Sequence, residues 1–244
     1  MNIRSSSTNS SVEVSLVIPT YNERENIGFL IKHVYAILRE RRYSFEVIVV
    51  DDDSPDGTWE VVQEMMSEYP YLRVLRRLGE RGLARAVMRG WQEAQGEILA
   101  VMDGDLQHPP EHLQKLVSAL RNDSGEIAIA SRYVEQGSVS EWKWHRRIVS
   151  STATVMASIL LPGRIRRVKD PMSGFFILKK SVIEGVTLKP IGYKILLEVL
   201  ARGRYQRVVE VPYTFEERTE GGSKMGPKQV WQYVIHLLRI RLGL

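Results

Sequence analysis

The chain has 244 residues, no cysteine and a formal net charge of +5. Its lack of cysteine excludes disulfide bonds and thiolate metal sites, and its length suits one large α/β domain or two small ones. Residues 1–11 are rich in Ser and Asn and contain no apolar segment. We therefore expect no signal peptide, and disorder over residues 1–12.

Apolar stretches alternate with stretches of helical periodicity along the first half of the chain. Strands are predicted at residues 12–19, 45–50, 72–75, 96–102 and 126–131, and helices at 24–39, 59–68, 82–94 and 110–120. Strands that alternate with helices predict βαβ units and a doubly wound, mainly parallel α/β sheet.

The positive charge of the chain is concentrated in residues 142–169. This segment holds seven Lys or Arg residues and no acidic residue, whereas the rest of the chain has fewer basic than acidic residues. Such a patch indicates phosphate, nucleic acid or an anionic membrane surface as a partner. Residues 148–161 carry no charge, but a bilayer span needs about 20 apolar residues. An interfacial helix and a buried core helix both remain open for this stretch.

The last third of the chain contains three more predicted elements. Residues 193–201 form a short helix, and residues 208–215 alternate as an edge strand that tolerates Pro212. Residues 228–242 form an amphipathic helix that could dock on a membrane, on a partner or on its own domain. Its apolar stripe consists of Trp231, Val234, Ile235, Leu238 and Leu242.

Polar residues follow three of the predicted strands, at residues 19–23, 51–58 and 103–107. In an open α/β sheet these ends meet where ligands bind. The Asp103 and Asp105 pair suits a hard divalent ion that carries phosphate oxygens, and the first two ends suit a base and a ribose. Each feature also has a purely structural interpretation, since Asn22 can cap a helix and Asp56-Gly57 can turn the chain. Because polar residues follow three successive strand ends of this kind, we favour a ligand site over the structural interpretation.

These strand ends belong to a longer set of motifs. The set comprises Val17-Ile18-Pro19-Thr20-Tyr21-Asn22-Glu23-Arg24-Glu25-Asn26, Val49-Val50-Asp51-Asp52-Asp53-Ser54-Pro55-Asp56-Gly57-Thr58, Asp103-Gly104-Asp105-Leu106-Gln107-His108-Pro109-Pro110-Glu111, Ser131-Arg132-Tyr133, Asp170-Pro171-Met172-Ser173-Gly174-Phe175, Gly192-Tyr193-Lys194, Val211-Pro212-Tyr213 and Gly222-Ser223-Lys224. With it, nearly the whole chain from Val14 onward resembles the family 2 glycosyltransferases, and most of all the dolichyl-phosphate mannose synthases and related polyprenyl-phosphate glycosyltransferases.

The resemblance implies a GT-A, Rossmann-like fold: a doubly wound, mainly parallel sheet in a single domain over residues 13–226. An acceptor-side helical insertion at 133–169 and a C-terminal amphipathic helix at 227–244 complete the implied organisation. Many relatives continue into transmembrane helices that this chain lacks. Peripheral membrane binding and a truncated chain both remain open as the reason.

The resemblance also implies roles for individual residues. Those expected to contact the donor nucleotide or its phosphates are Pro19, Tyr21, Glu23, Asp52, Asp103, Arg218 and Lys224. Those expected to hold Mg²⁺ or Mn²⁺ are Asp103, Asp105 and Gln107. Those expected to bind the acceptor phosphate are Arg132, Arg146 (or Arg147 in its place) and Ser150. Asp105 and Arg132 are the expected catalytic residues.

The implied activity is inverting transfer of a hexosyl group, with mannose from GDP-mannose favoured, to a polyprenyl or dolichyl phosphate. The protein would bind peripherally at the cytoplasmic face of a membrane, and a small membrane-anchor subunit is a further candidate partner. Three alternatives remain: a UDP-glucose-type donor, a soluble acceptor, and a catalytically silent nucleotide-binding subunit. No nucleic-acid partner is expected, because the basic patch is one segment without a recognition motif.

Overall fold

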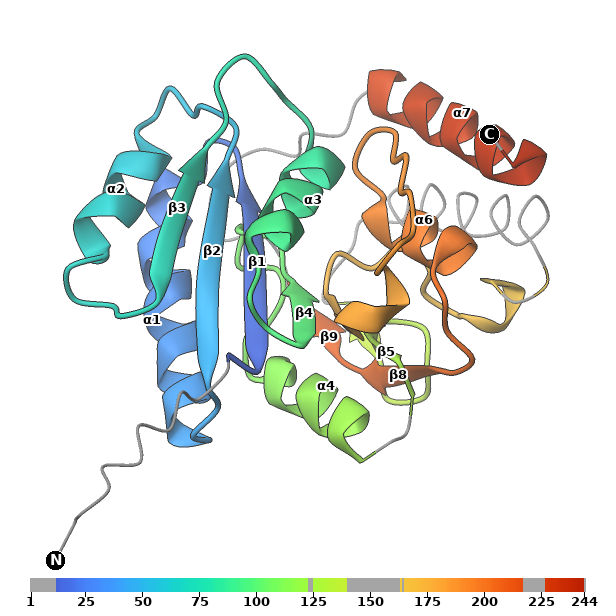
Figure 1. Cartoon of the computed structure of the whole chain (residues 1–244), viewed down its shortest axis with the longest axis horizontal. Helices are drawn as coiled ribbons and strands as arrows, with labels where there is room; N and C mark the ends of the chain where they lie inside the picture. Colours follow the sequence, from blue (N-terminus) through green and yellow to red (C-terminus); the bar gives the residue numbers. More distant parts are fainter. Residues whose placement is uncertain (1–11, 123–124, 140–162, 164, 217–226, 244) are drawn as a thin grey trace, which may run out of the picture.

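The computed structural model describes residues 12–122, 125–139, 163, 165–216 and 227–243 (Figure 1). The elements in chain order are β1 (Val14–Thr20), α1 (Arg24–Glu40), β2 (Phe45–Asp51), α2 (Thr58–Met65), β3 (Leu72–Arg76), α3 (Leu83–Glu93), β4 (Ile98–Val101), α4 (His112–Arg121), β5 (Ile127–Ser131), β6 (Ser138–Val139), the 3₁₀ turn η1 (Ile165–Arg167), β7 (Phe176–Lys179), the 3₁₀ turn η2 (Lys180–Val182), α6 (Ile195–Arg202), β8 (Val208–Pro212), β9 (Thr214–Phe215) and α7 (Pro227–Leu242).

Seven of the described strands form one sheet, in the order β3-β2-β1-β4-β7-β5-β8. All neighbouring pairs are parallel except those of β7, which runs antiparallel to both β4 and β5. The predicted mainly parallel sheet is therefore confirmed. The predicted strand at 208–215 is divided: β8 forms the edge of the large sheet, and β9 pairs with β6 in a separate two-stranded sheet.

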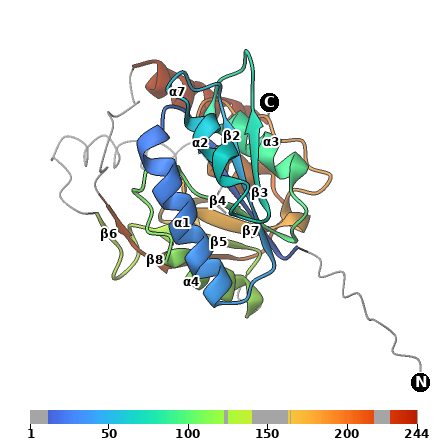
Figure 2. The same cartoon turned by 90° about the vertical axis from the view of Figure 1, so that its left-hand side faces the viewer.

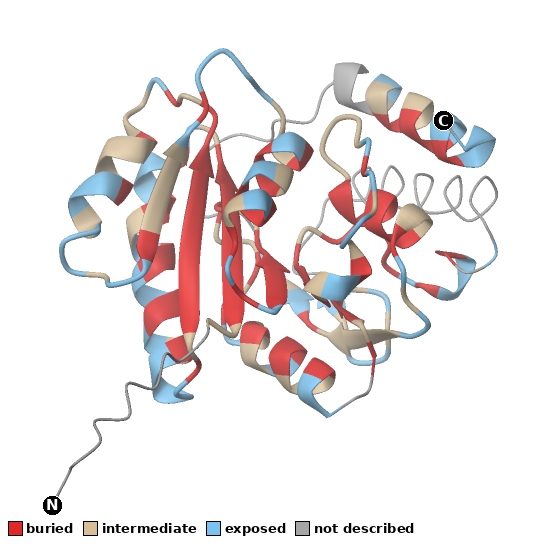
Figure 3. Cartoon of the chain, viewed as in Figure 1, coloured by how far each residue is buried: buried red, intermediate tan, exposed pale blue. Residues whose placement is uncertain are grey.

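Helices cover both faces of the large sheet, as a doubly wound fold requires. Alternate residues of each strand point to opposite faces, so Leu16 and Ile18 of β1 pack towards α1 and α4, whereas Val17 packs towards α3. Figure 2 shows α1 crossing in front of the sheet. The central strands are buried on both faces (Figure 3), which explains their nearly continuous apolar sequences.

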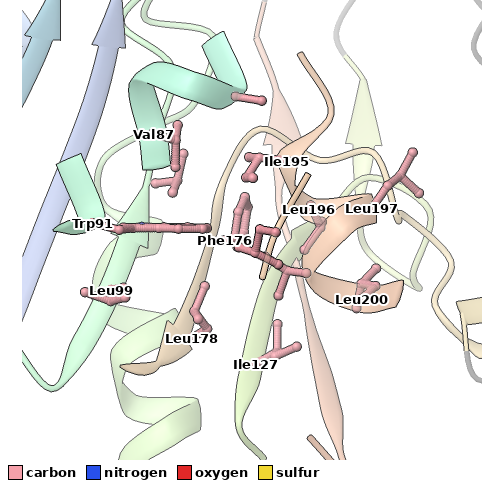
Figure 4. Close-up of a cluster of buried hydrophobic side chains, with 14 of the residues drawn as sticks. Val87, Trp91, Leu99, Ile127, Phe176, Leu178, Ile195, Leu196, Leu197 and Leu200 are labelled. Carbon is pink, nitrogen blue, oxygen red and sulfur yellow. The ribbon is translucent and has the colours of Figure 1, made fainter. Parts of the chain in front are cut away.

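Close packing of α3 on the sheet depends on a glycine. A Cβ atom at Gly90 would lie 2.5 Å from Cγ1 of Val17, so only glycine permits this approach. On the same face, α3 contributes Val87 and Trp91 to a cluster that includes Phe176 of β7 and Leu196 of α6 (Figure 4). This cluster joins the two halves of the sheet into one core.

The C-terminal helix α7 packs on its own domain, through a face other than the predicted apolar stripe. Its buried residues are Tyr233, His236, Leu237 and Ile240, and His236 Nε2 lies 2.8 Å from Oε2 of the buried Glu198 on α6. Three members of the stripe face outwards, namely Trp231, Leu238 and Leu242. The helix therefore has two apolar surfaces, one against the core and one exposed. No helix in the described part of the chain is long and apolar enough to span a bilayer.

Candidate active site

The three polar strand ends lie at one edge of the sheet. Thr20 at the end of β1 pairs with Asp51 at the end of β2, and Val17 pairs with Val101 of β4. Because these strands are parallel, the residues that follow them share the carboxyl edge, where open α/β sheets bind ligands. We call this edge the rim and define it as residues 19–23, 51–58 and 103–108.

The antiparallel strand β7 adds its starting segment to the rim. Val101 pairs with Phe176, the first residue of β7, so the residues just before β7 lie beside those just after β4. A Cβ atom at Gly174 would lie 2.4 Å from Oδ2 of Asp103. The Asp103 carboxylate thus rests against backbone that only glycine leaves open.

Asp103 has one carboxylate oxygen that the described residues leave without a hydrogen-bond donor. Oδ1 is buried and unpartnered, while Oδ2 lies 3.5 Å from Nε2 of His108. The other ring nitrogen of His108 lies 3.2 Å from the Tyr213 hydroxyl. Burying an unpartnered carboxylate oxygen costs free energy. Such an oxygen at the ligand-binding edge is what a site for a divalent ion would provide.

Asp105 and Gln107 are held by a tight turn. Leu106 has a φ of 62°, and Oδ1 of Asp105 accepts a hydrogen bond from the Gln107 backbone N–H at 3.2 Å. The Gln107 amide nitrogen donates to the Glu216 carbonyl at 3.1 Å, and the Glu216 N–H donates to the Gln107 carbonyl. The side-chain oxygen of Gln107 is therefore its potential metal ligand. The Gln107 amide group is thus hydrogen-bonded to Glu216, the residue that precedes 217–226.

The donor atoms at Asp103, Asp105 and Gln107 fit Mg²⁺ or Mn²⁺ only if another molecule completes the coordination. Within the described residues, no group of three or more His, Cys, Asp or Glu side chains is arranged to hold a metal ion. Two carboxylates and an amide oxygen leave several of the six positions of an octahedral ion for water or phosphate oxygens. This is the pattern of an ion that binds together with a phosphorylated ligand.

Replacing Gly174 by Ala is expected to weaken Mn²⁺ binding about tenfold or more. The added methyl group would collide with Oδ2 of Asp103 and push that carboxylate out of position. The free Mn²⁺ signal in electron paramagnetic resonance measures the affinity. Gly28→Ala on α1 is the control, because its methyl group would meet only ordinary contacts at 3.8 Å. Unchanged Mn²⁺ affinity in Gly174→Ala would exclude Asp103 as a ligand.

Asp51 and Asp53, in the run after β2, are both engaged by protein groups. Asp51 is buried and accepts hydrogen bonds from Thr20 Oγ1 at 2.7 Å and from Ser54 Oγ at 2.6 Å, which close the turn. The Asp53 side chain is 40 % exposed and forms an ion pair with Arg76 at 2.6 Å. These two carboxylates therefore shape the loop and its surface.

Asp52 is also fully engaged, by the loop between β3 and α3. Its Oδ1 accepts from Arg77 Nε at 2.7 Å, and its Oδ2 accepts from the Gly82 N–H at 2.6 Å. The Arg77 and Asp52 side chains are each 7 % exposed. Asp52 therefore fixes the loop at 77–82, and its contact with a nucleotide stays a prediction. Arg77 was missed from the sequence, although its place directly after a parallel strand was a usable signal.

The same loop covers the Tyr21 ring. The guanidinium carbon of Arg81 lies 4.6 Å from the centre of that ring, within cation–π distance. Glu23 is buried at the start of α1, and its carboxylate accepts a hydrogen bond from Asn26 Nδ2 at 3.0 Å. Pro19 is buried within β1, where it pairs with Val50. Of these three predicted donor-binding residues, Tyr21 is the one least enclosed by the fold.

Arg132 forms a bidentate ion pair with Asp170. Nε and one terminal nitrogen of Arg132 each lie 2.7 Å from a carboxylate oxygen, and the side chains are 9 % and 1 % exposed. Burial alone would lower the pKa of Arg132, but the hydrogen bonds and charge of Asp170 raise it above its usual value. The guanidinium therefore stays charged beside the rim. Asp170 lies in one of the sequence motifs, but that motif does not indicate that Asp170 holds Arg132.

Lys194 is a second cation of this region that the sequence did not single out. Its ammonium donates to the Met172 carbonyl at 2.8 Å, two residues before Gly174. Burial lowers the pKa of Lys194 to about 8, and Arg132 acts in the same direction, whereas Asp103 and Asp170 oppose the shift. Its place at the end of Gly192-Tyr193-Lys194, just before α6, was the available signal.

Four predicted site residues lie outside the described residues. Arg146 and Ser150 belong to 140–162, and Arg218 and Lys224 belong to 217–226. Residues 1–11, for which disorder is expected, also lie outside the described residues. The same is true of most of the basic segment at 142–169. The remaining predicted residues all lie at or just after the carboxyl ends of β1, β2, β4 and β5, at one edge of the sheet. They are Pro19, Tyr21, Glu23, Asp52, Asp103, Asp105, Gln107 and Arg132.

Comparison of the sequence with known proteins identifies the family to which the chain belongs. The family model for glycosyl transferase family 2 matches residues 15–187. A dolichol-phosphate mannosyltransferase of Pyrococcus furiosus is 51 % identical over 229 residues, which are 94 % of this chain and 64 % of that protein. The chain thus spans less than two thirds of that relative. A dolichol-phosphate mannosyltransferase of Saccharomyces cerevisiae is 40 % identical over 93 % of this chain and 86 % of its own length.

Solved structures share the fold at low sequence identity. Glucosyl-3-phosphoglycerate synthase from Mycobacterium tuberculosis, in complex with Mn²⁺, UDP and glucosyl-3-phosphoglycerate, superimposes with a TM-score of 0.68 at 18 % identity. The match covers 95 % of this chain and 80 % of that one. The same enzyme in complex with Mg²⁺ and UDP also has a TM-score of 0.68. The predicted GT-A, Rossmann-like fold is confirmed.

Proposed function

The chain belongs to glycosyl transferase family 2, and on this premise we propose that it transfers mannose from GDP-mannose to a polyprenyl or dolichyl phosphate. The observation that carries the proposal lies beside the rim: the Asp103 carboxylate, with its unpartnered oxygen, faces the same region as the partly buried cations Arg132 and Lys194. Negative side chains suited to a metal and positive side chains suited to a phosphate are what a transfer between two phosphorylated molecules requires.

Asp103, Asp105 and the side-chain oxygen of Gln107 would hold Mg²⁺ or Mn²⁺. Both ions occur in complexes of the Mycobacterium tuberculosis enzyme that shares the fold. When bound, such an ion supplies positive charge that stabilises a departing nucleoside diphosphate. The unpartnered oxygen of Asp103 and the glycine beside it support this assignment.

The donor nucleotide would lie along the strand ends of β1 and β2. Tyr21, under Arg81, offers a ring face for a base, and Asp52 holds the loop that carries Arg81. The contacts expected of Pro19 and Glu23 would be made by their backbone atoms, because both residues are buried. Arg218 and Lys224 would bind the donor phosphates from the segment that follows Glu216.

The phosphate oxygen of the acceptor would act as the nucleophile, and it is already negatively charged. A phosphate monoester has a second pKa of about 6, so it is mostly dianionic at neutral pH and needs no strong general base. Arg132, with Arg146 and Ser150, would position the acceptor oxygen in line with the anomeric carbon. In-line displacement inverts that carbon and gives a β-linked product from an α-linked donor.

The exposed face of α7 supports a peripheral position on a membrane. Trp231, Leu238 and Leu242 face outwards, and the exposed Arg239 and Arg241 accompany them. An apolar face edged by basic residues is typical of helices that lie in an anionic lipid interface. We propose the cytoplasmic face of the membrane as its location and a small membrane-anchor subunit as a further candidate partner.

Transfer of labelled sugar to lipid tests the proposal. The protein, Mn²⁺ and polyprenyl phosphate in detergent are incubated with radiolabelled GDP-mannose or UDP-glucose, and radioactivity in the organic phase is counted. We expect label from GDP-mannose, in β linkage by NMR, and none when polyprenol without phosphate is the acceptor. Label from UDP-glucose instead would reassign the donor. Absence of organic-phase label from both donors would overturn lipid transfer and leave a soluble acceptor or a silent nucleotide-binding subunit.

A further inference from the structure

Lys194 is held where the two halves of the sheet meet. Gly192 has a φ of 74°, and its carbonyl accepts a hydrogen bond at 3.4 Å from the Ala84 N–H in the first turn of α3. The chain then turns into α6, which begins at Ile195. This geometry lets the Lys194 side chain reach the Met172 carbonyl, in the segment that leads into β7.

Among the described residues, no carboxylate is paired with Lys194 alone. Asp103, Asp170 and Arg132 are the charged side chains that act on it. Asp170 is already paired with Arg132 by two hydrogen bonds of 2.7 Å. Asp103 is the residue expected to bind a metal ion. The described contacts of the Lys194 ammonium are a neutral carbonyl and the Tyr193 ring, whose centre lies 4.8 Å away.

Holding two segments together with a partly buried lysine that has no carboxylate partner among the described residues costs free energy. A carbonyl hydrogen bond contributes little against the loss of hydration of an ammonium group. Such a side chain is better explained by an anion that binds next to it. Two anions belong to this region under the proposed function: the diphosphate of the donor, and the phosphate of the acceptor.

We propose that Lys194 binds a phosphate group at the junction between the carboxylates of the rim and Arg132. This inference rests on the proposed function and adds a residue to it. The two phosphorylated substrates repel one another as they approach, and a cation placed between them lowers that repulsion. Lysine acts there as a compact point charge, without the bidentate geometry of arginine.

Two substitutions separate this role from a structural one. Lys194→Met keeps a long apolar side chain but removes the charge, and Lys194→Arg keeps the charge. We expect Lys194→Met to lower kcat/KM by about 10²-fold or more, the size seen when one charge-stabilising donor is removed, and Lys194→Arg to retain a larger share. Lys180→Met is the matched control, because Lys180 also donates to a backbone carbonyl, that of Ala94 at 3.3 Å, beyond the other end of β7.

The pH dependence gives a readout that a structural role would not change. In the wild type kcat/KM should fall as the pH rises through about 8, because Lys194 then loses its charge among Asp103, Asp170 and Arg132. In Lys194→Arg this alkaline fall should move to higher pH, since a guanidinium stays charged. An unchanged alkaline fall in Lys194→Arg would contradict the inference.

Binding measurements identify which phosphate Lys194 contacts. Calorimetry of GDP with Mn²⁺ reports the donor side, and the KM for polyprenyl phosphate reports the acceptor side. In Lys194→Met, an at least tenfold weaker GDP affinity or an at least tenfold higher KM for polyprenyl phosphate, with thermal unfolding unchanged, supports the inference and identifies the phosphate that Lys194 contacts. Values within twofold of wild type for both overturn it. If the wild type transfers no sugar to lipid but Lys194→Met weakens GDP binding, the proposed function fails and the phosphate site remains.

Discussion

Asp103→Asn is expected to lower kcat/KM for sugar transfer by about 10³-fold, or ~4 kcal/mol of transition-state stabilisation. The substitution keeps the shape of the side chain beside Gly174 and removes the negative charge that a divalent ion needs. The thermal midpoint should stay the same or rise, because the charge removed is on a partly buried carboxylate whose buried oxygen has no partner among the described residues. Initial rates of label transfer and a thermal melt measure the two effects.

Asp53→Asn provides the matched control for this result. Asp53 also follows a strand at the rim, but its ion pair with Arg76 is exposed, with side chains 40 % and 41 % accessible. Exposed pairs contribute about 0–1 kcal/mol, so both activity and stability should stay near wild type. If Asp103→Asn kept more than about a tenth of wild-type activity, the metal assignment at the rim would be wrong.

Asp170→Ala is expected to lower the free energy of unfolding by about 3–5 kcal/mol. It leaves the Arg132 guanidinium buried without the carboxylate that now receives two of its hydrogen bonds. It also removes the acceptor for the Arg132 backbone N–H, at 3.0 Å. Urea denaturation followed by circular dichroism measures the loss.

Two further variants show whether the buried charge causes that loss. Glu13→Gln weakens the exposed bidentate pair with Arg121, and should cost no more than about 1 kcal/mol. Arg132→Met combined with Asp170→Ala should recover part of the stability, because removing both charges is milder than removing one. Equal losses in the single and double variants would mean that packing, and not charge, explains the effect.

The Arg132 and Asp170 pair also affects how activity data should be interpreted. An Arg132→Ala variant would leave Asp170 buried and unpaired, so lost transfer could reflect partial unfolding as well as lost phosphate binding. Transfer rates for this variant therefore need correction for the folded fraction. Lys194 gives a cleaner test of the positive charge near the acceptor, since its described contacts are weak by comparison.

The sequence by itself determined the local structure and the position of the candidate site. Continuous apolar runs and apolar stretches with period 3.6 predicted the strands and helices of the first 131 residues, with ends that differ from the structure by at most three residues. Asp103 and Asp105 were found because they directly follow a buried strand, and a parallel sheet brings such ends to one edge. These signals are local, so a single sequence is enough to detect them.

Only the tertiary structure decided which distant groups meet. The antiparallel insertion of β7 between β4 and β5 places Gly174 against Asp103, and nothing in the residues around either position indicates that pairing. The same holds for Arg77 with Asp52 and for Lys194 with Met172. In α7 three residues of the predicted stripe face outwards, because a helix with apolar residues on two sides can dock by either one. Periodicity records which side chains share a face, whereas the partner of that face depends on strand order and on the packing of the whole core.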